Sequence, residues 1–124
     1  TKGILEKVKT HAGDVDFEVQ PELLSLFSNR DFGRYAGEKG EMNVCFISNN
    51  DITGGNSGSA MFNARGELLG LAFDGNWEAM SSDILYEPKM QRCIGVDVRY
   101  ILFMIEKYGK AGDLIRELKI VSGK

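Results

Sequence analysis

Ser57 has the sequence surroundings that a nucleophilic serine needs. It lies between Gly55 and Gly58, in a loop that follows one apolar run at residues 44–47 and precedes another at 68–73. A serine that attacks a carbonyl must hold its hydroxyl clear of the backbone, and nearby amides must face the developing oxyanion. Glycine permits the tight or left-handed turns of such a loop and lets a substrate approach the backbone. The segment predicts a nucleophile loop in which the amides of Gly55 and Ser57 form an oxyanion hole.

A plain turn is the alternative interpretation, because glycine, asparagine and serine are the residues that turns use most. The predicted order of elements favours catalysis, since one strand precedes the loop at Ser57 and another follows it. An α/β-hydrolase places its nucleophile between a strand and a helix, so this order argues against that fold. It fits the β-barrel serine peptidases, in which the serine loop joins two strands.

The residues predict a nucleophile without its base. Serine is a poor nucleophile until a base accepts its proton, and that base is usually a histidine held by a carboxylate. The one histidine, His11, lies in a polar segment with no sign of an oriented, packed base, and a surface histidine is the simpler interpretation. Asp51, Asp74 and Asp97 are candidate acidic partners. Asp51 is more simply a turn residue, and Asp97 a helix N-cap.

Two blocks of sequence resemble the S46 family of bacterial serine dipeptidyl peptidases. They are NNDITGGNSGS at residues 49–59 and GELLGLAFDGNWEAM at residues 66–80. The likeness continues through Glu87-Pro88, Gln91-Arg92, residues 96–100 and the C-terminal helical part, and upstream through residues 31–35. One departure is Ala60, which stands where the family usually has a proline that would fix φ.

The resemblance implies a larger enzyme. Members of the family are several times longer, so this chain is expected to be a C-terminal fragment whose catalytic histidine and aspartate lie in the N-terminal remainder. The fragment alone is expected to be inactive. For the full-length enzyme the resemblance implies oligopeptide substrates, no cofactor, a homodimer, and a location in the periplasm or at the cell surface of a Gram-negative bacterium.

The resemblance also implies that Asp74 binds the substrate's N-terminus. An α-amino group has a pKa of about 8, so it is cationic at neutral pH, and a fixed carboxylate would hold it. Phe73 and Gly75 flank Asp74 and are expected to border the S1 pocket. In the family a basic residue at position 75 goes with Asp/Glu preference and glycine with apolar preference, so a hydrophobic P1 residue is expected. The alternatives are an Asp-Gly turn at a strand end and a glycine that only satisfies a positive φ.

Two other classes of function stay open. A chymotrypsin-like endopeptidase fragment would use Ser57 and have no need for Asp74. A non-catalytic β-domain would bind a partner through its loops.

Composition is that of an ordinary globular protein. The chain has 124 residues, 43% hydrophobic and 27% charged, which predicts a single domain. The net charge is -3 without a basic stripe, which argues against a nucleic-acid partner. No apolar run reaches the length of about 18 residues that a membrane span needs. Cys45 and Cys93 lack the spacing of a metal site. Two buried free thiols are favoured, and a disulfide stays open.

The order of elements predicts a mainly β fold with C-terminal helices, the incomplete second β-barrel of a chymotrypsin-like (trypsin-like) serine peptidase spanning residues 1–124. Residues 1–20 are expected to be irregular, and a helix to run from Pro21 to before Gly33. The later elements are a turn at 37–40, a buried strand at 42–48, strands at 59–62 and 67–73 joined by a hairpin-like turn at 63–66, a loop over most of 77–89, a strand at 93–98, a helix from the N-cap Asp97 to Gly109, and a short helix at 111–118.

Overall fold

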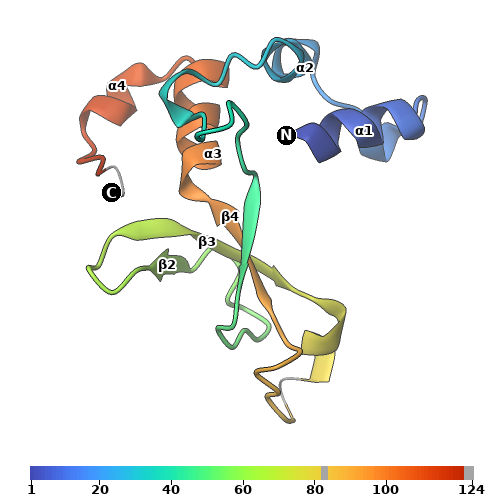
Figure 1. Ribbon diagram of the computed structural model, residues 1–124, viewed down its shortest axis with the longest axis vertical. Coiled ribbons are helices and arrows are strands. Elements are labelled where there is room, and N and C mark those ends of the chain that lie inside the picture. Colours follow the sequence, from blue (N-terminus) through green and yellow to red (C-terminus); the bar gives the residue numbers. More distant parts are fainter. Residues whose placement is uncertain (82–83, 122–124) are drawn as a thin grey trace. The chain divides into compact units, whose positions relative to one another are not determined.

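The chain forms two compact units. The computed structural model describes residues 1–81 and 84–121. The first unit is Thr1–Asn43 with Leu102–Lys119, and the second is Val44–Ile101 with Ile120 and Val121 of the described chain end. Figure 1 shows the elements of both. The helix α3 (Val98–Phe103) begins in the second unit, and its last two residues belong to the first.

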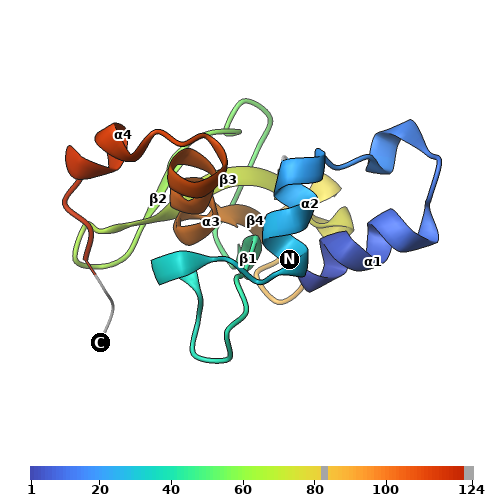
Figure 2. The same ribbon diagram turned by 90° about the horizontal axis from the view of Figure 1, so that it is seen from above.

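Helices and short helical turns build the first unit. They are α1 (Lys2–Thr10), η1 (Val15–Phe17), α2 (Pro21–Ser28), η2 (Gly33–Tyr35), the π-helical turn η4 (Met104–Tyr108) and α4 (Gly112–Arg116). Pro21 occupies the first position of α2, where its missing N–H is no loss. Figure 2 shows α1 and α2 side by side, in agreement with the contacts between them.

Three phenylalanines form the centre of the first unit. The ring of Phe103 lies 6.0 Å from the rings of both Phe27 and Phe32, which are 6.5 Å apart. All three side chains are buried. Beside them Glu106 accepts hydrogen bonds from the Arg34 guanidinium at 2.9 and 3.2 Å and from the Tyr35 hydroxyl. The packed rings and the hydrogen bonds to Glu106 hold η2 against η4.

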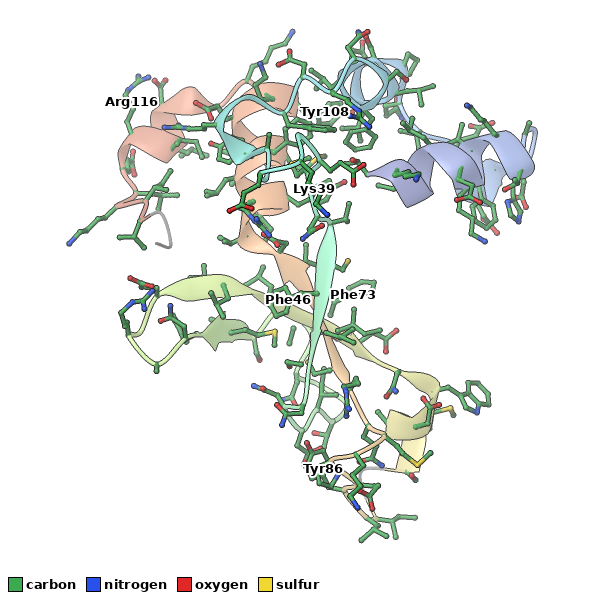
Figure 3. All side chains as sticks on the ribbon, in the orientation of Figure 1. Lys39, Phe46, Phe73, Tyr86, Tyr108 and Arg116 are labelled. Atoms are coloured by element: carbon green, nitrogen blue, oxygen red, sulfur yellow. The ribbon has the colours of Figure 1, made fainter. Side chains whose placement is uncertain are left out.

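The second unit is an open antiparallel sheet. Its strands are β1 (Cys45–Ser48), β2 (Ala60–Phe62), β3 (Leu68–Gly75) and β4 (Cys93–Asp97), in the spatial order β1-β4-β3-β2. Met61, Ala72 and Cys93 are buried between the strands, with Phe46 and Ile52 packed against them. Figure 3 shows Phe46 on β1 and Phe73 on β3. The two central strands are β4 and β3, and the end of β3 leads into the candidate site.

Several expectations from the sequence are confirmed. The helix at Pro21, the turn at 63–66 between β2 and β3, and the short helix α4 are present. Asp97 caps α3, because its Oδ1 accepts from the amide of Arg99 at 2.9 Å. Gly109 follows the last residue of η4. None of the described helices is both long and apolar enough to cross a membrane.

Other expectations are wrong. Residues 2–10 form the helix α1, with Ile4, Leu5 and Val8 half-buried along one face. The strand β1 is not buried, because it lies at an edge of the sheet, and Ile47 on it is 68% exposed. Both cysteines are free thiols as expected, but only Cys93 is buried.

The barrel is not confirmed, since β1 and β2 each have one strand neighbour in the described part of the chain. The expected loop at 77–89 begins with the helical turn η3 (Trp77–Ser81), and its residues 82–83 lie outside the described residues.

Candidate active site

The loop that carries Ser57 has a backbone that requires glycine on both sides. The φ angles are +94° at Gly55 and +89° at Gly58, in the region that residues with side chains rarely adopt. Two hydrogen bonds between Asn56 and Thr53 close the loop. The side-chain Oδ1 of Asn56 accepts from the backbone amide of Thr53 at 2.9 Å, and the backbone amide of Asn56 donates to the Thr53 carbonyl at 3.2 Å. The turn chemistry of these residues therefore presents Ser57 on an exposed, internally bonded loop.

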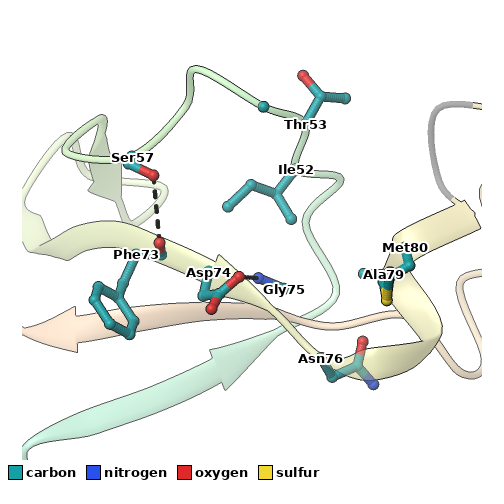
Figure 4. A pocket seen from close by; sticks show the side chains of 10 residues that line it. Ile52, Thr53, Ser57, Phe73, Asp74, Gly75, Asn76, Ala79 and Met80 are labelled. Carbon is teal, nitrogen blue, oxygen red and sulfur yellow. Dashed lines mark hydrogen bonds between the residues drawn. The ribbon is translucent and has the colours of Figure 1, made fainter. Parts of the chain in front are cut away.

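Hydrogen bonds fasten this loop to β3. The amide of Gly58 donates to the carbonyl of Ala72 at 2.7 Å, and the amide of Ala72 donates to the carbonyl of Ser59 at 2.8 Å. The hydroxyl of Ser57 lies 3.4 Å from the carbonyl oxygen of Phe73, to which it donates (Figure 4). The nucleophile candidate is thus held at the strand that carries Asp74.

The amides of Gly55 and Ser57 have no acceptor among the described residues, in contrast to those of Asn56, Gly58 and Ser59. A pair of free amides on either side of Asn56 is what an oxyanion hole requires. Their role as an oxyanion hole stays a prediction.

A β-bulge brings two side chains of β3 to the surface. Ala72 pairs with Gly95 and Asp74 with Ile94, so β3 has one extra residue, Phe73, at this point. In a regular strand Asp74 would share the buried face of Ala72. The bulge instead leaves both Phe73 and Asp74 exposed. Bulges often re-aim a side chain next to an active site.

Ser57 and Asp74 line one open pocket of about 250 Å³ in the second unit. Asp74 is the one charged side chain among the described residues that line it, and its Oδ1 accepts from the amide of Gly75 at 2.8 Å. The other lining residues are Ile52, Thr53, Gly54, Phe73, Gly75, Asn76, Ala79 and Met80 (Figure 4). The pocket therefore combines the hydroxyl of Ser57, an oriented carboxylate and apolar side chains.

Gly75 is a glycine because of close packing. It is not among the glycines with positive φ, so the alternative based on backbone conformation is wrong. A Cβ added at Gly75 would lie 2.8 Å from the Cβ of Ala79. The pocket wall formed by η3 leaves no room for a side chain at this position.

The described contacts of His11 are those of a packed surface histidine. Its ring stacks on Phe17 at a centroid distance of 4.1 Å, and Nδ1 lies 2.9 Å from Oγ1 of Thr10. Asp97 caps α3 and pairs with the Arg99 guanidinium at 2.6 Å. Asp51 is exposed in the loop before Ser57. The structure thus gives His11 and Asp97 structural roles.

Sequence reasoning missed three apolar residues of the pocket lining. They are Ile52, Ala79 and Met80, and none belongs to a motif with chemistry of its own. The signal that was available is the glycine at position 75, which marks a close approach as well as a turn.

Comparison with known proteins assigns the chain to a class of peptidases. The sequence model described as Peptidase S46 matches residues 1–120, and the chain belongs to this family. It is 57% identical over 122 residues to a dipeptidyl-peptidase 7 of Porphyromonas endodontalis. It is 48% identical over 119 residues to an Asp/Glu-specific dipeptidyl-peptidase of Capnocytophaga gingivalis.

Solved structures agree with the fold described above. The crystal structure of Porphyromonas endodontalis DPP11 in complex with the dipeptide Arg-Glu matches with a TM-score of 0.88 and 44% identity. The match covers 94% of this chain and 16% of that one. The matches to the two relatives above include 98% and 96% of this chain. They include only 14% and 16% of the relatives' own lengths.

Proposed function

We propose that the longer protein containing this chain is a serine-type dipeptidyl peptidase that releases dipeptides from free N-termini. The observation that carries the proposal is the shared pocket of Ser57 and Asp74, on a chain of a peptidase family whose relatives are named dipeptidyl-peptidases. The pocket supplies a nucleophile and, beside it, a carboxylate that can hold an α-ammonium group.

In this proposal Ser57 Oγ attacks the carbonyl carbon of the second substrate residue. Its proton passes to a histidine base outside this chain, and the carbonyl oxygen becomes an oxyanion between the amides of Gly55 and Ser57. The peptide C–N bond then breaks, and the departing amine takes the proton from the base. Water hydrolyses the resulting acyl-enzyme ester and releases the dipeptide.

Asp74 would restrict cleavage to the second peptide bond. A carboxylate fixed by the amide of Gly75 would bind the substrate ammonium in the same pocket in which Ser57 attacks. The distance between the two groups then measures two residues. An endopeptidase has no use for this carboxylate, which is why the exposed Asp74 favours the dipeptidyl activity.

The pocket favours an apolar P1 side chain. Phe73, Ile52, Ala79 and Met80 supply apolar surface, and the described lining contains no cationic side chain to neutralise a glutamate. The Asp/Glu-specific relatives represent the competing preference. Paired chromogenic dipeptides with leucine or glutamate at P1 separate the two specificities.

The decisive experiment uses the full-length protein and one leucine-P1 substrate in two forms, with a free and with an acetylated N-terminus. The proposal expects turnover of the free form and at most weak turnover of the acetylated form. Equal turnover of both would indicate an endopeptidase, and turnover of neither would favour a binding module.

A homodimer and a periplasmic or cell-surface location are further proposals. Sedimentation of the full-length protein tests the first, and cell fractionation of the parent organism tests the second.

A further inference from the structure

Ala79 stands where a side chain at position 75 would have to lie. A Cβ on Gly75 would be 2.8 Å from the Cβ of Ala79 and 3.6 Å from Cγ2 of Ile52. Non-bonded carbon atoms pack at about 3.5–4.0 Å. The contact with Ile52 is therefore ordinary, and the overlap is with Ala79 alone.

The turn η3 that carries Ala79 is tied to the end of β3. The amide of Ala79 donates to the carbonyl of Asn76 at 2.9 Å. The side-chain amide of Asn76 donates to Oε2 of Glu78 at 2.7 Å and to the carbonyl of Met90 at 2.9 Å, and its Oδ1 accepts from the amide of Arg92 at 2.8 Å. Ala79 is thus part of a bonded turn at the pocket edge.

Gln91 ties the same turn from the other side. Its side chain is buried, and its Nε2 donates to the carbonyl of Glu78 at 3.1 Å, to Oγ of Ser81 at 3.2 Å and to the carbonyl of Leu85 at 3.0 Å. Moving η3 outward would leave this buried amide without acceptors, which is costly. Ala79 therefore cannot retreat freely from position 75.

We propose that Ala79 is a specificity-determining residue of the pocket. Its methyl group restricts position 75 to glycine and sets the space that a P1 side chain finds between β3 and η3. This inference rests on the proposed function, because it concerns the pocket that Ser57 and Asp74 share, and it adds the residue that controls which side chains enter.

The test is a double-mutant cycle in the full-length protein with Gly75→Ala, Ala79→Gly and the double variant. Chromogenic dipeptide amides with a free N-terminus and leucine or phenylalanine at P1 report kcat/KM, and thermal unfolding reports the overlap independently of activity. Gly3→Ala and Ala64→Gly are the matched controls. A Cβ at Gly3 meets no atom within 4 Å, and Ala64 is exposed in the turn before β3.

Overpacking destabilises a packed contact, so Gly75→Ala should lower the unfolding temperature. The added methyl group also displaces the pocket edge, so kcat/KM for leucine should fall about tenfold or more. The double variant should recover to within about threefold of wild type, because the two sites are in contact and their effects do not add. Ala79→Gly alone should raise the phenylalanine-to-leucine ratio about threefold or more, since it enlarges the pocket. The controls should leave kcat/KM and the phenylalanine-to-leucine ratio unchanged.

Two results would overturn the inference while leaving the proposed function intact. One is a wild-type protein that cleaves the N-terminally free dipeptide amides together with a double variant that is no better than Gly75→Ala. The other is an unchanged substrate ratio in Ala79→Gly. A wild-type protein that cleaves no N-terminally free dipeptide amide would overturn the proposed function itself. Recovery of the unfolding temperature in the double variant would still establish the contact between positions 75 and 79.

Discussion

The Ser57 hydroxyl lies 3.4 Å from the carbonyl oxygen of Phe73, the residue that the β-bulge displaces. The bulge therefore acts at two places. It places a backbone carbonyl where the Ser57 hydroxyl donates, and it leaves the next side chain, Asp74, exposed. In this account the spacing between nucleophile and ammonium-binding carboxylate depends on one extra residue in β3.

Asp74→Asn should impair cleavage of N-terminally free substrates and hardly affect N-acetylated ones. Asparagine keeps an oxygen that can accept from the amide of Gly75, so the change removes the charge and preserves the local hydrogen bond. A charge-assisted hydrogen bond contributes about 1.5–3 kcal/mol, so a loss of about tenfold or more in kcat/KM is expected. Kinetics on both forms of one peptide, with Asp51→Asn as the control, decide it. An equal loss on both forms would make Asp74 structural.

His11→Ala should leave the activity of the full-length protein unchanged. The ring of His11 stacks on Phe17, so the substitution removes a packing contact and no base. Steady-state kinetics across pH are the measurement. A loss of several orders of magnitude, as expected for removal of a catalytic base, would make His11 the base. The 124-residue chain alone should accordingly show no turnover.

Gly75→Arg should switch the P1 preference toward acidic residues only when combined with Ala79→Gly. An arginine there would pair with a P1 carboxylate, but its Cβ meets Ala79 as any side chain would. We expect the single variant to lose leucine substrates without gaining glutamate, and the double variant to favour glutamate by about tenfold. Paired leucine and glutamate substrates measure this. A complete change of P1 preference in the single variant would mean that η3 moves away from position 75 more easily than its hydrogen bonds indicate.

Much of the candidate site could be predicted from sequence because its signals are local. The glycines beside Ser57 demand a special backbone, and Asp97 caps a helix through its own side chain. These features depend on residues a few positions apart, so the order of residue types is enough to find them.

The bulge at Phe73 and the packing of Ala79 on Gly75 depend on pairing between distant segments. The alternation of buried and exposed residues along β3 does not predict an extra residue. The register shift exists only in the pairing of β3 with β4. The exposure of Cys45 likewise follows from the position of β1 at a sheet edge. The helix α1 was not predicted for another reason, because its apolar residues are few.

The carboxylate of Glu106 should titrate below its ordinary range. The hydrogen bond from the Tyr35 hydroxyl, aided by the Arg34 guanidinium, lowers the pKa of Glu106 from its ordinary value of 4.5. A lowered folded-state pKa stabilises the fold above the ordinary carboxyl pKa, and this stabilisation is lost as pH falls through the lower folded value. Carboxyl-carbon NMR of the chain measures it.

Tyr35→Phe should move the pKa of Glu106 back toward its ordinary value, because it removes the hydroxyl that donates. The pKa of Glu67 is lowered by Arg65 and Asn63 and should stay where it is, which makes Glu67 the internal control. A Glu106 pKa above the ordinary value in the unmodified chain would contradict the hydrogen bonds that Arg34 and Tyr35 donate to Glu106.

Covalent labelling determines whether Ser57 is the nucleophile. The full-length protein is treated with a fluorophosphonate, digested, and examined by mass spectrometry, alongside the Ser57→Ala and Ser59→Ala variants. Ser59 is the matched control, because its backbone joins the loop to β3 while its hydroxyl has no described hydrogen bond. We expect one phosphonate on Ser57, no label and no turnover in Ser57→Ala, and normal labelling in Ser59→Ala. A label on Ser59, or an unlabelled and fully active Ser57→Ala protein, would contradict it.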